Sequence, residues 1–196
     1  MRISIKSVAF SGLLLLSATQ ARAALFQYSA DFSGSNESSA NSSRGVGTGT
    51  VSYDDNSHFL TLQAVFSGLT GTTTASHIHA ATALPFTSNA GVATTIPTFL
   101  GFPLGVGSGS FLSSLDLTLA SSYNPNYVAA HGGTTLQAEA DLTAAMAAGK
   151  AYWNIHSTFA PGGEIRGFLV AVPEPSTLTL MLTGLGLLAA RRRARV

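Results

Sequence analysis

The sequence has 196 residues, no cysteine and a formal net charge of +1 at pH 7. The absence of cysteine excludes disulfide bonds, cysteine-ligated zinc and thiol catalysis. Most basic residues lie near the two ends, and residues 24–172 hold three basic against eight acidic residues, a net charge of −5. This acidic central part lacks the basic surface that phosphate contacts need, so nucleic acid is not an expected partner.

The first 23 residues have the three parts of a secretory signal peptide. Arg2 and Lys6 form a charged start, an apolar run covers residues 8–16, and the segment ends on the small residues Ala21 and Ala23. Signal peptidase accepts small side chains beside the bond that it cuts, so we predict cleavage after Ala23. The apolar run is short for a membrane span, which disfavours the alternative of an uncleaved N-terminal anchor.

The central part of the chain has the patterning of β-strands. Apolar and polar residues alternate over residues 26–32, 60–66 and 115–119, and glycine, asparagine, aspartate and serine separate such runs. Asn124-Pro125-Asn126 predicts one of the turns. Period-2 alternation is typical of half-buried antiparallel strands. Seven or eight strands of this kind predict an all-β fold, an antiparallel β-sandwich or Greek-key barrel.

Three segments interrupt this pattern. Residues 136–148 are rich in alanine and leucine and are followed by Gly149, which predicts one short helix. Residues 33–43 are rich in serine and asparagine and predict a mobile loop. Residues 80–110 show no clear period, and we expect a long loop that crosses the sandwich and holds a short strand.

Three short segments hold polar side chains of the types that carry chemistry, each pair separated by one apolar residue. The pairs are His77 and His79, Asn154 and His156, and Glu164 and Arg166. On a strand, residues at i and i+2 face the same side, so the intervening isoleucines, and Trp153, should face the core. Polar groups of these types are costly to bury unless they are paired. We therefore expect them to meet one another or a ligand.

Two interpretations of these residues remain open. The first is a polar network, in which the imidazoles bond to Asn154, Glu164 and the backbone, and Glu164 pairs with Arg166. The second is a copper or zinc site with His77, His79 and His156 as ligands, because a strand H-x-H pair with a distant third histidine is a recurrent metal geometry. In that site Glu164 would accept the second N–H of an imidazole, and Arg166 would keep Glu164 ionised.

The other histidines are weaker candidates, and no catalytic motif is present. His58 lies at a strand start and is expected to be exposed, whereas His131, in a loop, is an outside candidate for a fourth ligand. The sequence has no G-x-S-x-G, no phosphate-binding loop and no H-E-x-x-H. No catalytic residue, and no enzymatic activity, is therefore predicted.

The last 24 residues predict a removable membrane anchor. Pro173, Glu174 and Pro175 form a stiff start, residues 178–190 are almost wholly apolar, and residues 191–195 include four arginines. An apolar helix followed by a basic cluster predicts a single span with its C-terminus in the cytoplasm. The stretch is shorter than the roughly 20 residues that a span prefers, which suits a segment that is later removed. The alternative is a permanent tail anchor.

This tail resembles the PEP-CTERM sorting signal, which has the same three parts in the same order. The resemblance implies a Gram-negative bacterium, transient insertion in the inner membrane, and processing by an exosortase-type enzyme. The protein would then reach the cell surface or the extracellular space.

The central part resembles the CHRD domain. The motifs that carry the resemblance are Gly34-Ser35-Asn36-Glu37, His77-Ile78-His79, the segment 149–156 and the segment 161–167. Ser38 and Ser39 stand where the family pattern has prolines. The resemblance implies an immunoglobulin-like or superoxide-dismutase-like β fold but supplies no reaction. The H-x-H strand is similar to that of copper/zinc superoxide dismutase, yet the cysteines and zinc-loop ligands of that enzyme are missing, so dismutase activity is not expected.

These observations define three parts: a signal peptide at 1–23, a CHRD-like β domain at 24–172 and a sorting tail at 173–196. The favoured function is an exported structural or interaction protein of the cell surface or extracellular matrix. The alternative is a copper- or zinc-binding β-sandwich protein with redox activity as an option. Signal peptidase and an exosortase-type enzyme are the expected processing partners, and matrix or polysaccharide is a candidate surface partner.

A first prediction concerns the mature chain. Cell-surface material from the native host should begin at Ala24 and lack residues 178–196, because both terminal segments carry processing signals. Intact-mass spectrometry measures this directly. Finding residues 191–195 still attached in most molecules would contradict removal of the tail.

Overall fold

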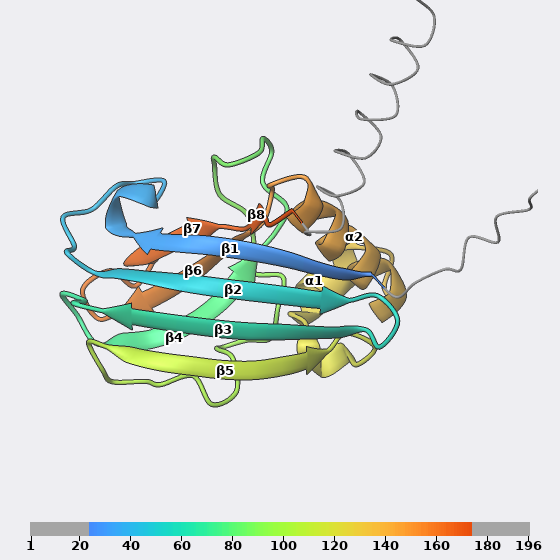
Figure 1. Cartoon of the computed structure of the whole chain (residues 1–196), viewed down its shortest axis with the longest axis horizontal. Helices are drawn as coiled ribbons and strands as arrows, with labels where there is room; N and C mark the ends of the chain where they lie inside the picture. Colours follow the sequence, from blue (N-terminus) through green and yellow to red (C-terminus); the bar gives the residue numbers. More distant parts are fainter. Residues whose placement is uncertain (1–23, 174–196) are drawn as a thin grey trace, which may run out of the picture.

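The computed structural model of the protein describes residues 24–173 and is mainly β (Figure 1). The strands are β1 (Leu25–Ser33), β2 (Val46–Asp54), β3 (Phe59–Ser67), β4 (Thr73–His79), β5 (Gly109–Asp116), β6 (Tyr152–Ser157), β7 (Ile165–Phe168) and β8 (Val170–Ala171). The helices are α1 (Pro125–Ala130) and α2 (Thr135–Ala147), with 3-10 turns η1 (Gly34–Asn36) and η2 (Ala120–Ser122).

The predicted signal peptide with its cleavage site at Ala21 and Ala23, and the sorting tail from Glu174 and Pro175 onward, lie outside the described residues. Within residues 24–173, no helix is both long enough and apolar enough to cross a membrane.

The strands form one antiparallel sheet that curls over on itself. Its order is β4-β6-β7-β1-β2-β3-β5, and β8 pairs with β1 beside β7. Figure 1 shows β1, β2, β3 and β5 in one layer and β4, β6 and β7 behind it. β1 meets β7 at a single register pair, Ser33 with Arg166, which is where the sheet turns from one layer into the other. The predicted antiparallel all-β class is confirmed, and the two layers of the sandwich-like fold belong to one sheet.

The core lies between the two layers and follows the predicted alternation. In the front layer Phe32 and Leu62 are among the buried side chains, and the back layer contributes Ile78, Trp153 and Ile155. Trp153 is fully buried, and its ring meets that of Phe32 edge-on, with centroids 5.5 Å apart. Such edge-to-face contacts add to the free energy of burial.

Two neighbours of Trp153 make room for its ring and satisfy its one polar group. Its indole N–H donates to the Ser76 hydroxyl at 2.7 Å, and that hydroxyl donates to the carbonyl of Asn154 at 2.9 Å. Opposite the ring lies Gly49, where a Cβ atom would come within 3.1 Å of the indole. The same Cβ atom would lie 2.7 Å from Cζ of Phe32, so the packing of both rings against the β2 backbone requires the glycine.

The helical region differs from the prediction in its first half. The predicted helix at 136–148 is α2, which begins after Thr134, whose side chain accepts from the backbone N–H of Gln137. The segment 124–126 was predicted as a turn but starts a second helix, α1. Asn124 caps it by accepting from the Asn126 N–H, and Pro125 fits the first helical turn.

The predicted strand at 115–119 was placed too late in the chain. β5 runs from Gly109 to Asp116 and stops where the Asp116 carboxylate accepts from the backbone N–H and the hydroxyl of Thr118. This local bonding turns the chain away from the ladder. Leu117 is fully buried, although it lies beyond the end of β5. The alternation therefore predicted its burial correctly but not its place outside a strand.

Two loops cover the outer face of the back layer. The long connection between β4 and β5 makes only isolated bridges, Val92 with His79 and Thr94 with Tyr123, where a short strand was expected. The serine-rich segment before β2, predicted to be a mobile loop, is tied to the sheet because Asn41 donates to the carbonyl of Glu164 at 2.9 Å.

Helix α2 is attached to the front layer through one buried carboxylate. Glu139, 4% exposed, accepts from the Tyr53 hydroxyl at 2.7 Å and from Nδ1 of His58 at 2.8 Å. The side chain of His58 is 40% exposed. The residue as a whole is half-buried, where an exposed residue was predicted, because it bonds to Glu139. The hydrogen bond and the charge of Glu139 raise the pKa of His58.

This contact predicts a pH dependence of stability with a defined sign. A histidine whose pKa is raised by folding stabilises the native state below about pH 6.5, and that contribution is lost as the pH rises past the raised value. The difference in free energy of unfolding between the wild type and His58→Gln should therefore shrink from pH 6 to pH 9 in urea titrations. A difference that stays constant over this range would contradict the assignment.

Candidate functional site

The outer face of the back layer holds a row of polar side chains. β6 lies between β4 and β7, and the register places Asn154 opposite His77 on one side and Arg166 on the other. The next pair on the same face is His79 with Tyr152. The apolar residues between them, such as Ile78, point into the core as expected from the alternation.

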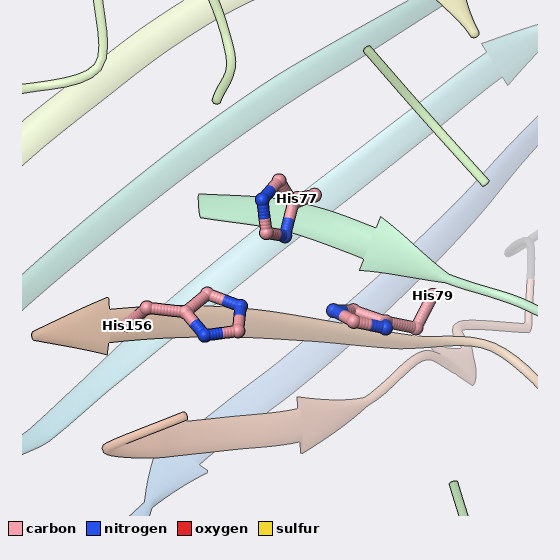
Figure 2. Close-up of side chains that lie close together, drawn as sticks. All are labelled: His77, His79 and His156. Atoms are coloured by element: carbon pink, nitrogen blue, oxygen red, sulfur yellow. The ribbon is translucent and has the colours of Figure 1, made fainter. Parts of the chain in front are cut away.

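Three histidines meet on this face. Figure 2 shows the rings of His77 and His79 from β4 and of His156 from β6 pointing toward one another. Their ring centroids lie 4.8 to 5.9 Å apart. Although they lie on the side of the sheet opposite the core, they are only 7–8% exposed, because the connecting loops cover them.

Each imidazole is held by a backbone carbonyl on the side away from the cluster. His77 uses Nε2 to donate to the carbonyl of Pro97 at 2.8 Å. His79 and His156 use Nδ1, with the carbonyls of Ala90 and Pro161 each at 2.9 Å. A carbonyl can only accept, so the bonded nitrogen carries the proton and the other nitrogen carries a lone pair.

The three lone pairs converge without a partner. Nδ1 of His77 and the Nε2 atoms of His79 and His156 are buried and have no hydrogen-bond partner among residues 24–173. These three atoms all lie within 4.8 Å of one another. Buried acceptors are normally satisfied, so three in one place call for a donor or a cation.

The environment keeps the three imidazoles neutral. Burial and the neighbouring imidazoles together lower the pKa of His77 to about 4. Burial also lowers the pKa of His79 to about 4 and shifts that of His156 in the same direction. Neutral imidazole is the form that binds metal ions, so at pH 7 the cluster is in its ligating state.

The geometry fits a transition-metal ion after a small closure. A metal–nitrogen bond is about 2.0–2.1 Å, so ligating nitrogens lie at most about 4 Å apart. In a tetrahedral site the nitrogens lie about 3.3 Å apart, so the cluster, whose ligand atoms lie within 4.8 Å of one another, would have to close by up to roughly 1.5 Å through rotation of the side chains. Three protein ligands would leave a fourth position for an exchangeable group.

Glu164 does not orient an imidazole. It is fully buried and accepts from the hydroxyls of Ser43 and Ser157 and from the backbone N–H groups of Thr70 and Gly71. Burial alone would raise its pKa, and these four hydrogen bonds outweigh that effect and lower it. The expected role of Glu164 is filled instead by the three backbone carbonyls.

Arg166 does not pair with Glu164. Its Nε lies 3.8 Å from the carboxylate of Glu37 and donates to the carbonyl of Asn36. Burial raises the pKa of Glu37 to about 7, although the positive charge of Arg166 opposes the shift. In the sequence, Glu37 stands out only as the last residue of the motif Gly34-Ser35-Asn36-Glu37, and no periodicity marks it as buried.

The remaining candidates lie in different surroundings. Asn154, 2% exposed, is next to the cluster, and its Oδ1 has no partner among the described residues. His131 donates from Nδ1 to the carbonyl of Tyr127 at 2.8 Å and stacks on that ring, so it does not join the cluster. His58 bonds to Glu139.

The cluster predicts acid sensitivity of the metal-free protein. Between about pH 6.5 and pH 4 the unfolded chain binds protons on these histidines that the folded domain excludes, so the free energy of unfolding falls as the pH drops through that window. At about 1.4 kcal/mol per pKa unit, the lowered pKa values of His77 and His79 correspond to a loss of several kcal/mol. Urea titrations of the purified exported protein with chelator present should show it, and His77→Leu should reduce the pH slope. An unchanged slope in that variant would contradict burial of a neutral imidazole.

Comparisons with known proteins bear on the family and the tail. The CHRD domain model matches residues 28–169, well over half of the chain, and the PEP-CTERM protein-sorting motif matches residues 171–195. No curated protein and no solved structure matches the chain. The sorting motif implies processing by an exosortase-type enzyme and a location at the cell surface or outside the cell. The chain therefore belongs to the CHRD domain family and carries a PEP-CTERM sorting motif.

Proposed function

We propose that this exported CHRD domain binds one copper or zinc ion through His77, His79 and His156. The observation that supports it is the convergence of three buried lone pairs that have no partner among the described residues. A single cation would satisfy all three at once.

The arrangement of the rings favours this function over a purely structural network. A network would give each imidazole partners on both nitrogens, whereas here each ring is fixed on one side and open on the other. Leaving a buried acceptor unsatisfied costs about 1–3 kcal/mol. Fixing the outer nitrogen also sets the tautomer and orientation of each ring, which is how proteins prepare histidine ligands for a metal.

The ligand set limits the choice of ion. Imidazole nitrogens suit copper and zinc, whereas calcium and magnesium prefer oxygen ligands. The carboxylate that the sequence suggested for this site, Glu164, is occupied by four donors. Divalent copper binds such sites more tightly than zinc, so copper should displace zinc in competition.

The sequence also predicts a structural or interaction role, and this role concerns the exported protein as a whole and not the histidine cluster alone. Its support is the sorting motif, which implies a location at the cell surface or outside the cell. We propose that metal binding is the activity that this display serves. The immunoglobulin-like or superoxide-dismutase-like relationship implied by the family resemblance is likewise a proposal, supported by the two-layered antiparallel sheet.

Metal titration of the purified exported protein tests the function. Isothermal titration at pH 7.5 should give one copper or zinc ion per chain, and elemental analysis of the loaded protein should agree. His77→Ala should weaken binding more than about 100-fold, since it removes one of three ligands. Affinity should also fall as the pH approaches about 4, the lowered pKa of His77 and His79, because protons then compete for the imidazoles.

Two histidines outside the cluster provide matched controls. His58→Ala and His131→Ala change the same residue type at sites bonded to Glu139 and to Tyr127. Both should bind metal like the wild type. Absence of stoichiometric metal, or equal losses in His58→Ala and His77→Ala, would reject the site.

A further inference from the structure

We propose that the polar pocket beside His79 binds a neutral saccharide through Glu37 and Asn154. This site is distinct from the metal centre and does not depend on metal being bound. The pocket has a volume of about 460 Å³, enough for a small organic ligand, and borders the histidine cluster at His79. Short hydroxyl and amide side chains, among them Ser39 and Asn89, line it.

Two buried oxygen atoms in its wall have no partner. The side chain of Glu37 is 8% exposed and Asn154 is 2% exposed, yet Oε1 of Glu37 and Oδ1 of Asn154 accept no hydrogen bond from residues 24–173. A buried acceptor without a hydrogen bond is satisfied only when a donor reaches it. Both residues line the pocket, so a donor-bearing ligand can supply what the protein does not.

The two oxygens face the same small space. A Cβ atom at Gly163 would lie 2.8 Å from Oε1 of Glu37 and 2.7 Å from Oδ1 of Asn154. Gly163 itself lines the pocket and has a φ of +133°, a conformation that side chains rarely allow. The two acceptors therefore lie close enough for neighbouring hydroxyl groups of one ligand to reach both.

The site is held in place before any ligand arrives. Arg166, 2% exposed, donates to the carbonyl of Ser88 at 3.2 Å and to the side chain of Asn89 at 2.8 Å. Its guanidinium lies 4.6 Å from the ring centroid of Tyr152 and faces Oε2 of Glu37. The ion pair with Arg166 and the adjacent amide of Asn154 position Glu37, and such preorganisation lowers the entropy cost of binding.

The charges select a neutral ligand. Arg166 offsets the charge of Glu37, so a cationic ligand would be repelled by Arg166 as well as attracted by Glu37. The net charge of −5 over residues 24–172 disfavours a polyanion. A neutral ligand with several hydroxyl donors remains, which is the chemistry of a saccharide. Polysaccharide was a candidate partner from the sequence, and the proposal now names the residues that would bind it.

Binding of defined oligosaccharides to the purified exported protein tests the proposal. The neutral probes are cellohexaose, maltohexaose and mannohexaose, measured by calorimetry with chelator present, and the charged probes are hexagalacturonate and spermidine. At least one neutral probe should bind, and neither charged probe should bind more tightly. Asn154→Ala and Glu37→Gln should weaken binding at least 10-fold.

Three further variants separate ligand binding from folding and from metal. Ser39→Trp should block the pocket from its exposed rim, whereas Ser42→Trp, three residues further along the same exposed segment and not part of the pocket lining, should bind like the wild type. His77→Ala should bind saccharide normally while losing metal. Binding of no neutral probe, preference for a charged probe, or equal effects of Ser39→Trp and Ser42→Trp would each overturn the saccharide site and leave the metal proposal intact.

Discussion

Burial of polar side chains on the outer face of the back layer is the constraint on which this structure depends. A sheet in a two-layered fold usually gives its outer face to water, but here loops cover that face and leave the histidines 7–8% exposed. Every polar group beneath the loops then needs a partner, because water is largely excluded. Loop carbonyls accept from the histidines, four donors bond to Glu164, and Arg166 bonds to loop carbonyls and lies beside Glu37.

The strand alternation made part of this arrangement predictable. The i, i+2 spacing of His77 and His79 and of Asn154 and His156 was enough to place them on one face, and the buried isoleucines on the other. That the two strands would be neighbours was a condition that the sequence left open. The pairing of β4 with β6 meets it.

What the sequence could not show were the partners supplied by irregular chain. The carbonyls of Ala90, Pro97 and Pro161 come from loops, and any residue type provides a carbonyl, so no pattern marks them. Glu164 was given the wrong partner for the same reason, since the N–H groups of Thr70 and Gly71 compete for it. Asn124 and Pro125 were assigned to a turn because helix caps and turns use the same residues.

The way the loops hold the imidazoles has an evolutionary consequence. Because the loops contribute backbone carbonyls to the histidines, their own side chains can diverge without changing the three nitrogens that converge. Relatives could therefore alter the length and chemistry of the cover, and with it what approaches the centre, while keeping the same strands beneath it. Sequence divergence in residues 80–108 would then mark differences in ligand between family members, and not the loss of the histidine cluster.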